Sequence, residues 1–146
     1  MEDKELALLL LENFNIFDNM IKNVTGSGMK KIQKFTTKQF FTLEQMKKYD
    51  KIELKNLSKD LYVSTSSLCI LLNKMVDNDY VFREEDPKDR RNTFYGMTEK
   101  GREVLAEEED RIASVLVQNM NGFDEKFKKN LEKSLMVLIK AAEKLY

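Results

Sequence analysis

The hydrophobic period of this chain changes in its second half, and this change restricts the fold more than any other feature. Up to Asp77 the apolar residues recur at spacings of three and four, as on amphipathic helices. The segments Tyr80 to Arg83 and Thr93 to Met97 instead carry aromatic and β-branched residues that suit two short strands. Helical spacing returns after Thr98. The sequence therefore predicts one β-hairpin, with the charged run "REEDPKDRRN" around its tip, in a mainly helical chain.

Two amphipathic helices are predicted before this hairpin region. The apolar face of the first is formed by Leu6, Leu9, Leu10, Phe14, Phe17, Met20, Ile21 and Val24. The run "TGSG" from Thr25 is expected to end it, because glycine and small polar residues interrupt helices. Thr36 and Gln39 have the spacing of a capping box, so the second helix is expected to begin there and to continue through Met46.

A helix-turn-helix is predicted directly before the hairpin. After a short extended piece around Ile52, a brief helix is marked by Leu54, Leu57 and Leu61, and Ser64 is the expected N-cap of a longer helix. At 100° per residue, one side of the longer helix carries Leu68, Leu71, Leu72 and Met75. The opposite side carries Ser66, Ile70, Asn73, Lys74 and Asp77. A helix-turn-helix followed by a hairpin is the winged layout, whose second helix enters the major groove of DNA.

The outer side of the longer helix is the candidate DNA-binding surface. Hydroxyl, amide and ammonium groups are the types that contact phosphates and base edges. Ile70, in the middle of this side, suits contact with thymine methyl groups. The candidate residues are Ser64, Thr65, Ser66, Ser67, Ile70, Asn73 and Lys74. The competing interpretation is an ordinary solvated helix face.

Two helices are predicted after the hairpin. Thr98 is the expected N-cap of a helix with Val104, Leu105, Ile112, Leu116 and Met120, and Asp124 caps a last helix with Phe127, Leu131, Leu135, Leu138 and Leu145. The terminal apolar runs exceed what a small lobe can cover, so residues 1–25 and 105–146 are expected to dimerise beside a lobe at residues 36–102. The predicted fold is a single, mainly α domain with a small β-hairpin wing.

Composition argues against several functions. The chain has 25 basic and 25 acidic residues, so affinity for DNA must come from a local surface. It has no His, one Cys and no Gly-rich phosphate loop, which predicts neither an enzyme nor a metal or cofactor. Cys69 is interpreted as a small, half-buried residue rather than a redox switch. The N-terminal apolar run is far below the ~20 residues of a membrane span, so no membrane partner and a cytoplasmic location are expected.

The run "LKNLSKDLYVSTSSLCILLNKMVDNDYVFREEDPKDRRNTFYGMTEKGREVL" resembles the DNA-binding core of the multiple-antibiotic-resistance regulator (MarR) family, most specifically over "DPKDRRNTFYGMTEKG". The resemblance implies a winged helix-turn-helix repressor that binds a palindromic DNA operator as a homodimer. It also implies release by a small aromatic or anionic effector. Asp79 replaces the family's usual Gly, Met97 its Leu, and Ile70 a base-reading Arg. Asp tolerates a left-handed helix end, whereas Ile70 removes the usual base contact.

The run "REEDPKDRRN" carries four basic and four acidic residues, so their positions must sort the charges. The acids lie mostly on the outgoing strand and the arginines on the returning side. The candidate wing residues are Lys88, Asp89, Arg90 and Arg91. Asp89 is placed to orient a neighbouring guanidinium, and an arginine held in this way at a hairpin tip is expected to enter a minor groove. The alternative is a surface salt-bridge cluster worth ~0–1 kcal/mol per pair.

Other features leave their alternatives open. The basic residues around the second helix either touch phosphates or are ordinary solvated lysines: Lys30, Lys31, Lys34, Lys38, Lys47, Lys48 and Lys51. Five side chains line an effector pocket or simply form core: Phe14, Phe17, Met20, Phe40 and Tyr49. The run "AEEEDR" from Ala106 to Arg111 is interpreted as a solvated helix face. The alternative function is a winged-helix module that binds proteins and has no specific affinity for DNA.

Overall fold

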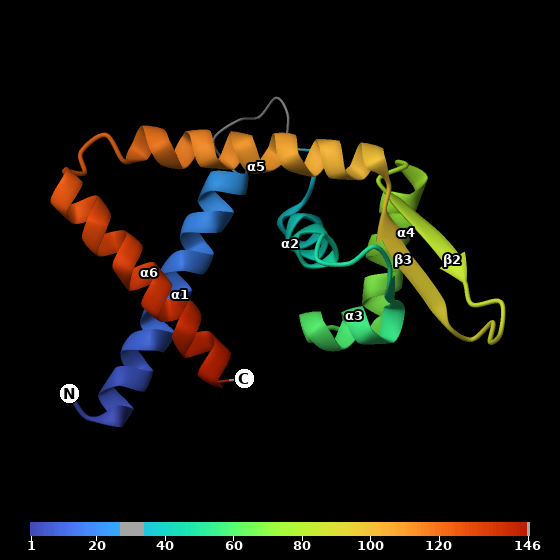
Figure 1. Ribbon diagram of the computed structural model, residues 1–146, viewed down its shortest axis with the longest axis horizontal. Coiled ribbons are helices and arrows are strands. Elements are labelled where there is room, and N and C mark those ends of the chain that lie inside the picture. The colour runs from blue at the N-terminus through green and yellow to red at the C-terminus, as the bar shows by residue number, and fades with distance from the viewer. Residues whose placement is uncertain (27–33, 146) are drawn as a thin grey trace. The chain divides into compact units, whose positions relative to one another are not determined.

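The computed structural model describes residues 1–26 and 34–145. Its elements are α1 (Asp3–Gly26), α2 (Thr37–Met46), β1 (Ile52–Glu53), α3 (Leu54–Leu61), α4 (Thr65–Asp77), β2 (Val81–Glu85), β3 (Thr93–Met97), α5 (Glu99–Asn119) and α6 (Glu125–Leu145) (Figure 1). Residues 1–112 and 113–146 form two compact units. The predicted fold class, a helix-turn-helix followed by a hairpin wing, is confirmed. The single domain stays a prediction.

The hairpin belongs to a three-stranded antiparallel sheet with strand order β1-β3-β2. Ile52 and Arg83 both lie opposite Tyr95, so β3 is the central strand. The sequence pattern predicted only an extended piece at Ile52, and pairing with β3 makes it a strand. The predicted strand from Tyr80 to Arg83 is shifted, because β2 runs from Val81 to Glu85. Pairing of its last two residues with β3 overrides the weak strand preference of glutamate.

The core lies where α2, α3, α4 and the sheet meet. Its largest fully buried side chains are Leu43, Met46, Leu57, Leu72, Met75, Val81 and Tyr95. The helix α5 begins against this core through a close backbone approach. A Cβ added at Gly101 would lie 2.0 Å from the carbonyl oxygen of Tyr80, and the Thr98 N–H donates to that same oxygen at 3.1 Å. Glycine in the "TEKG" run is therefore required by packing.

The predicted helix caps are confirmed. Thr36 and Gln39 form both hydrogen bonds of a capping box at the start of α2. The Thr98 hydroxyl accepts from the Gly101 N–H at 2.9 Å, and Asp124 Oδ1 accepts from the N–H three residues on at 2.7 Å. Asp79 adopts a left-handed φ of 62°, as its replacement of glycine predicted. The helix α1 continues through Gly26, and the rest of the "TGSG" run lies outside the described residues.

The interpretation of "AEEEDR" as a solvated helix face is wrong for one residue. Glu108 is 5% exposed and belongs to the buried side of α5. Its carboxylate accepts two hydrogen bonds from the half-buried Arg111 guanidinium, one of them from Nε at 3.0 Å. Because an acid needs a partner when it is buried, an arginine three residues away makes this burial possible. The carboxylate raises the pKa of Arg111 further.

The terminal helices expose much of their apolar surface in the single chain. The helix α6 has no buried residue, and its exposed large apolar side chains are Phe127, Leu135, Met136, Val137, Leu138, Ile139 and Leu145. On α1 they are Leu6, Leu8, Leu9, Leu11, Phe14, Ile16 and Phe17. None of the helices in the described part of the chain combines the length and apolarity that a membrane crossing requires.

Candidate nucleic-acid interface

The helix α4 buries one side and exposes the other, as its sequence pattern predicted. Leu68, Leu72 and Met75 are buried, whereas Ser66, Ile70, Asn73, Lys74 and Asp77 are exposed. The Ser64 side chain caps the helix by accepting from the Ser67 N–H at 3.2 Å. The four residues Ser64 to Ser67 are all exposed. Their hydroxyls therefore gather at the positive end of the helix dipole, where an anionic group is favoured.

Ile70 is the apolar exception on this outer side. Its side chain is 62% exposed, with Ser66 one turn before it and Lys74 one turn after it. A single exposed isoleucine is ordinary on a protein surface. In the middle of an otherwise polar helix side, it offers the methyl groups that fit against thymine.

The Asn73 side chain does not extend freely from α4. Its amide nitrogen donates to Cys69 Sγ at 3.6 Å, and its amide oxygen accepts from the Tyr95 hydroxyl at 3.3 Å. Cys69 is half-buried, as predicted. Tyr95 is fully buried on the central strand, and no periodicity or motif in the sequence pointed to its contact with the outer side of α4.

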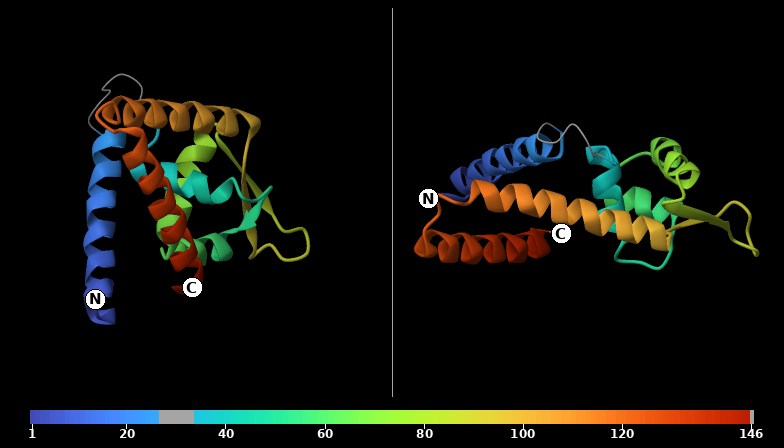
Figure 2. Two further views of the ribbon diagram at one scale, coloured as in Figure 1. Left: turned by 60° about the vertical axis from the view of Figure 1, so that its left-hand side comes forward. Right: turned by 90° about the horizontal axis from the view of Figure 1, so that it is seen from above.

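The wing tip is a turn organised by two aspartates. The Asp86 N–H donates to the Asn92 carbonyl at 3.0 Å and closes the tip. The Asp86 carboxylate accepts from the Lys88 N–H at 2.9 Å, and Asp89 accepts from the Arg91 N–H at 3.1 Å. Such contacts, two residues on, are typical of aspartate in turns. Both views of Figure 2 show the tip projecting beyond the helices of the lobe.

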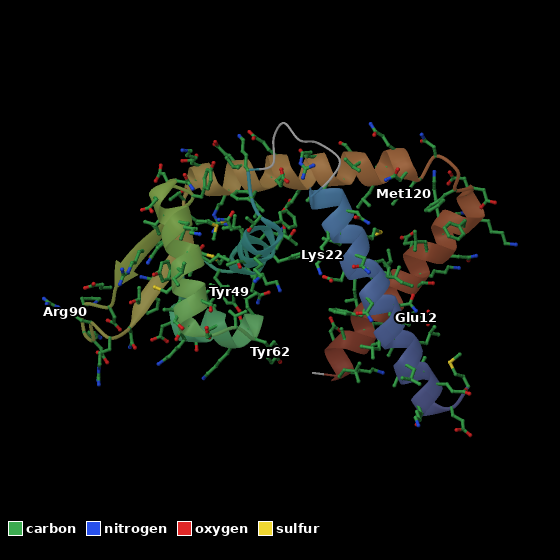
Figure 3. All side chains as sticks on the ribbon, turned by 180° about the vertical axis from the view of Figure 1, so that it is seen from behind. Glu12, Lys22, Tyr49, Tyr62, Arg90 and Met120 are labelled. Carbon is green, nitrogen blue, oxygen red and sulfur yellow. The ribbon has the colours of Figure 1, made fainter. Side chains whose placement is uncertain are left out.

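Asp89 holds the guanidinium of Arg91 through two parallel hydrogen bonds, as its position suggested. Nε donates to Oδ1 at 3.0 Å and Nη2 donates to Oδ2 at 3.2 Å. The hydrogen bonds from Arg91 lower the pKa of Asp89, so this carboxylate remains charged. The Arg91 side chain is still 90% exposed. The neighbouring Arg90 points outward from the tip (Figure 3), and no carboxylate within the described ranges pairs with it.

A shallow pocket of about 200 Å³ lies between the starts of α3 and α4 and the returning side of the wing. Lys55, Thr65 and Arg91 line it together with Glu53, which pairs with Lys55 at 3.5 Å. The fold thus brings three possible phosphate contacts from three elements to one surface. Lys55 was missed from the sequence because it lies on α3, outside both α4 and the wing. Only the tertiary fold brings it close to them.

The lysine-rich region around α2 has less net positive charge in the fold than a count of charges along the local sequence gives. Lys34 pairs with Glu107 at 3.6 Å, Lys47 with Glu109 at 2.6 Å and Lys51 with Glu84 at 3.3 Å. These acids come from α5 and β2, and a local count cannot include them. Lys30 and Lys31 lie outside the described residues. The structure therefore favours the interpretation of Lys34, Lys47 and Lys51 as ordinary surface residues.

A pocket of about 520 Å³ lies among α1, α2, α3 and α4. Its lining includes Lys22 of α1, Phe41 of α2, Leu61 of α3 and Ser67 of α4. It is lined by none of the five aromatic and methionine residues for which the sequence left pocket or core as alternatives. Phe14 is instead 70% exposed, and Phe40 packs against the core. In residues 1–26 and 34–145 no group of three or more His, Cys, Asp or Glu side chains could hold a metal ion.

A helix-turn-helix whose second helix has a polar outer side, followed by a charged hairpin, defines a winged helix-turn-helix DNA-binding transcriptional regulator. The family model for "Transcriptional regulator SarA/Rot" matches residues 26–107. The chain belongs to this family of transcriptional regulators.

Known proteins with similar sequences or a similar fold agree with this assignment. The "HTH-type transcriptional regulator YkoM" of Bacillus subtilis is 26% identical over 71% of this chain and 67% of its own length. SarZ of Staphylococcus aureus is 28% identical over 58% of this chain, and the match spans about half of its length, 55%. Escherichia coli MarR in complex with operator DNA superposes with a TM-score of 0.66 at 18% identity, over 94% of this chain and 99% of that one. The resemblance to MarR is thereby confirmed at the level of the fold.

Proposed function

We propose that two copies of this chain bind a palindromic DNA operator, each placing α4 in the major groove and its wing in the adjacent minor groove. The observation that carries this proposal is the arrangement of the outer side of α4 beside the exposed arginines of the wing. Because the whole chain has a formal net charge of +0, its affinity for DNA must come from this local surface and not from an overall positive charge. The solved complex of MarR with operator DNA supports this mode of binding by its similar fold.

The residues of α4 divide between positioning and reading. The hydroxyls of Ser64, Thr65 and Ser67 bind phosphates at the helix N-terminus, whereas the Ser66 hydroxyl contacts a base edge. Ile70 contacts a thymine methyl, and Asn73 pairs with a base edge, for which adenine is the best partner of an amide. Lys74 binds a phosphate. Changing Asn73 or Ser66 to Ala is therefore expected to alter base preference, and Lys74→Ala to weaken all sequences alike.

The wing supplies the second contact through Lys88, Arg90 and Arg91. Arg90 is free to enter the minor groove, where a narrow A·T-rich stretch concentrates negative potential. Arg91 is held by Asp89, so less side-chain freedom is lost when it binds. Lys55 and Thr65 line the same pocket as Arg91. All three side chains bind the same DNA phosphate in this scheme.

The homodimer follows from the exposed apolar side chains of the terminal helices. Leu8 and Leu11 lie outside the main apolar face of α1, so this helix needs cover on more than one side. The helix α6 has no buried residue of its own. A two-fold dimer that covers both helices removes this surface from water and sets two α4 helices at a fixed spacing.

Occupation of an operator blocks access to a promoter without any further contact, so we assign repression as the outcome of binding. The pocket of about 520 Å³ is the proposed effector site, since its volume is typical of small-molecule sites. Phe41, Leu61 and Leu71 give it apolar walls that suit a small aromatic ligand. At its polar part Lys38 offers an ammonium group to an anionic ligand, whereas Lys22 is paired with Asp18, which also lines the pocket. Because Ser67 also lines it, a ligand there contacts the first turn of α4.

The remaining assignments follow from operator binding. The protein acts in the compartment that holds the DNA, which in bacteria such as those of its relatives is the cytoplasm. Membership of a family of regulators supports a role without catalysis, cofactor or metal. The alternative is a winged-helix module that binds a protein through the same surface.

Salt dependence separates DNA binding from the protein-binding alternative. Titration of labelled DNA from the region flanking the protein's own gene, over a salt series, should give an affinity that falls steeply as salt rises, because bound phosphates release counterions. Footprinting on the same DNA should protect two half-sites. An affinity for DNA that is weak, independent of sequence and insensitive to salt would contradict the proposed function and favour the protein-binding module.

A further inference from the structure

Three polar groups meet at the border between the buried and outer sides of α4. Cys69 and Asn73 are one helical turn apart, and Tyr95 comes from the central strand of the wing sheet. The Tyr95 hydroxyl lies 3.3 Å from Asn73 Oδ1, Asn73 Nδ2 lies 3.6 Å from Cys69 Sγ, and Cys69 Sγ lies 3.7 Å from the Tyr95 hydroxyl oxygen. Each group therefore contacts both of the others.

The protons available to these groups form a closed ring. The Tyr95 hydroxyl has one hydrogen and gives it to the amide oxygen of Asn73. Its oxygen accepts the hydrogen of the Cys69 thiol, and the thiol sulfur accepts from the amide nitrogen of Asn73. Every group therefore donates once and accepts once within the ring. Hydrogen bonds linked in this way strengthen one another.

The ring selects one orientation of the Asn73 amide. A phenol is the strongest donor of the three groups and an amide oxygen the strongest acceptor, whereas a thiol is weak in both roles. The observed orientation joins the strongest donor to the strongest acceptor, and a flipped amide would pair each of them with sulfur or nitrogen. Burial, with the Cys69 contact, raises the pKa of Tyr95 to about 12. The hydroxyl therefore keeps its hydrogen at neutral pH.

The ring leaves part of the amide available. Asn73 is exposed, and its amide retains a second N–H and a second lone pair on Oδ1. An asparagine that reads adenine needs one donor and one acceptor in a fixed order. An unrestrained exposed amide rotates, and it must lose this freedom when it binds a base. An amide that is already held in one orientation loses less rotational freedom on binding. It also presents its donor and acceptor to the base in one fixed order.

We propose that Tyr95 and Cys69 are positioning residues for sequence recognition, which fix the amide of Asn73 and thereby set the base that α4 prefers. This inference rests on the proposed function, in which Asn73 pairs with a base edge. It links the wing sheet to the recognition helix, because a strand residue of the wing orients a reading residue of α4. Neither Tyr95 nor Cys69 contacts DNA in this scheme.

The test compares full-length variants on a library of randomised double-stranded DNA, with base preference read from the selected sequences. Tyr95→Phe removes the hydroxyl and keeps the buried ring. It should reduce discrimination at the base pair read by Asn73 by about 2- to 10-fold, the effect of one lost neutral hydrogen bond. Affinity for unrelated DNA and its salt dependence should not change. Tyr49→Phe is the matched control, since it removes a hydroxyl that donates to Asp60 at 3.0 Å in the same lobe.

Two further variants separate positioning from a structural role. Cys69→Ala opens the ring from its other side and should reduce the same discrimination by a smaller factor, because sulfur contacts are weaker. In the Asn73→Ala background, Tyr95→Phe should have no further effect on base preference, since the residue it orients is gone. A conformational defect of the lobe would lower affinity in both backgrounds alike, and melting curves of each variant check the fold.

The outcomes distinguish the inference from the proposed function. If Asn73→Ala changes base preference and Tyr95→Phe does not, the ring has no role in recognition and the inference is wrong while the proposed function stands. If Asn73→Ala leaves every base preference unchanged, the reading role of Asn73 and the inference both fail. An equal loss from Tyr95→Phe with and without Asn73 also overturns the inference, because the tyrosine then acts by another route.

Discussion

The lobe around Leu72 buries its apolar side chains, whereas the last helix, α6, exposes them. In the lobe, α2, α3, α4 and the sheet each contribute fully buried side chains to one core. In α6, no residue is buried and Leu135 is 40% exposed. A segment that leaves its apolar face uncovered depends on a further partner for its stability. In the proposed function, this difference corresponds to folding and DNA contact by the lobe and assembly by the terminal helices.

The largest predicted effects come from changing one leucine to alanine in each region, and the two changes should act on stability in different ways. Leu72→Ala creates a cavity in the lobe and should lower the free energy of unfolding by about 2–5 kcal/mol at every protein concentration. Leu135→Ala should have an effect that depends on protein concentration, because it acts through subunit association. Denaturant titrations at two concentrations measure both. A loss for Leu135→Ala that is the same at each concentration would remove the distinction between the regions.

A charge on the exposed face of α6 sharpens the comparison further. Leu138→Asp should leave the lobe folded and dissociate the dimer, because an unpaired carboxylate is strongly disfavoured in an apolar interface. Operator affinity should then fall on the order of 100-fold, as the two half-sites are no longer bound together. Sedimentation and DNA titration test both effects.

Asn130→Asp is the matched control for Leu138→Asp. It adds the same charge to the same helix at a position that already carries an exposed polar side chain. This variant should remain a dimer with unchanged operator affinity. A dimeric Leu138→Asp variant would show that α6 does not form the subunit interface.

The wing allows a smaller effect to be measured within the lobe. Arg90→Ala and Arg91→Ala should each weaken operator binding and reduce the salt slope by ~1. Asp89→Ala should also weaken binding, although it makes the wing more positive. The Arg91 guanidinium then loses its bidentate partner, and ordering it on DNA costs up to ~2 kcal/mol of side-chain entropy.

Asp86→Ala is the control for the Asp89 variant. It removes the same charge from the same tip and a similar hydrogen bond to a backbone N–H, but it releases no guanidinium. Simple electrostatics predicts tighter binding for both variants. The role of Asp89 in orienting Arg91 predicts tighter binding for Asp86→Ala alone. If Asp89→Ala binds more tightly at every salt concentration, that role is wrong.

The smallest predicted effect concerns a carboxylate between α2 and α5. Burial, followed by the contact with Glu109, raises the pKa of Glu44 in the folded state. The folded chain therefore favours protonated Glu44, so this contribution to stability is present below the ordinary pKa of 4.5 and is lost as pH rises through the folded value. Glu44→Gln should raise the melting temperature slightly at pH 7, and the difference should shrink at pH 4. A lower melting temperature at pH 7 would show that the ionised carboxylate stabilises the lobe.

The sequence was sufficient for features that depend on neighbouring residues. The caps at Thr36 and Ser64, the two sides of α4 and the pairing of Asp89 with Arg91 all follow from spacings of two to four residues. These were predicted because local hydrogen bonds and helical periodicity are encoded within one or two turns.

Features that depend on long-range contacts could not be predicted in this way. Glu108 has the appearance of one more surface acid within "AEEEDR", and only the packing of α5 buries it. The lysines around α2 face acids that lie more than thirty residues away, as in the pair of Lys51 and Glu84. Tyr95 contacts Asn73 because the fold brings a side chain of the central strand to α4. No local pattern contains this information.

The most direct test of the account is the DNA sequence that the unmodified protein selects from a randomised double-stranded library. Two copies joined by their terminal helices should select an inverted repeat, with half-site centres about one helical turn apart or a multiple of it. Each half-site should combine a major-groove element with an adjacent A·T-rich step for the wing. Selection of a single, unrepeated site, or of no sequence above background, would contradict the division of roles between the lobe and the terminal helices.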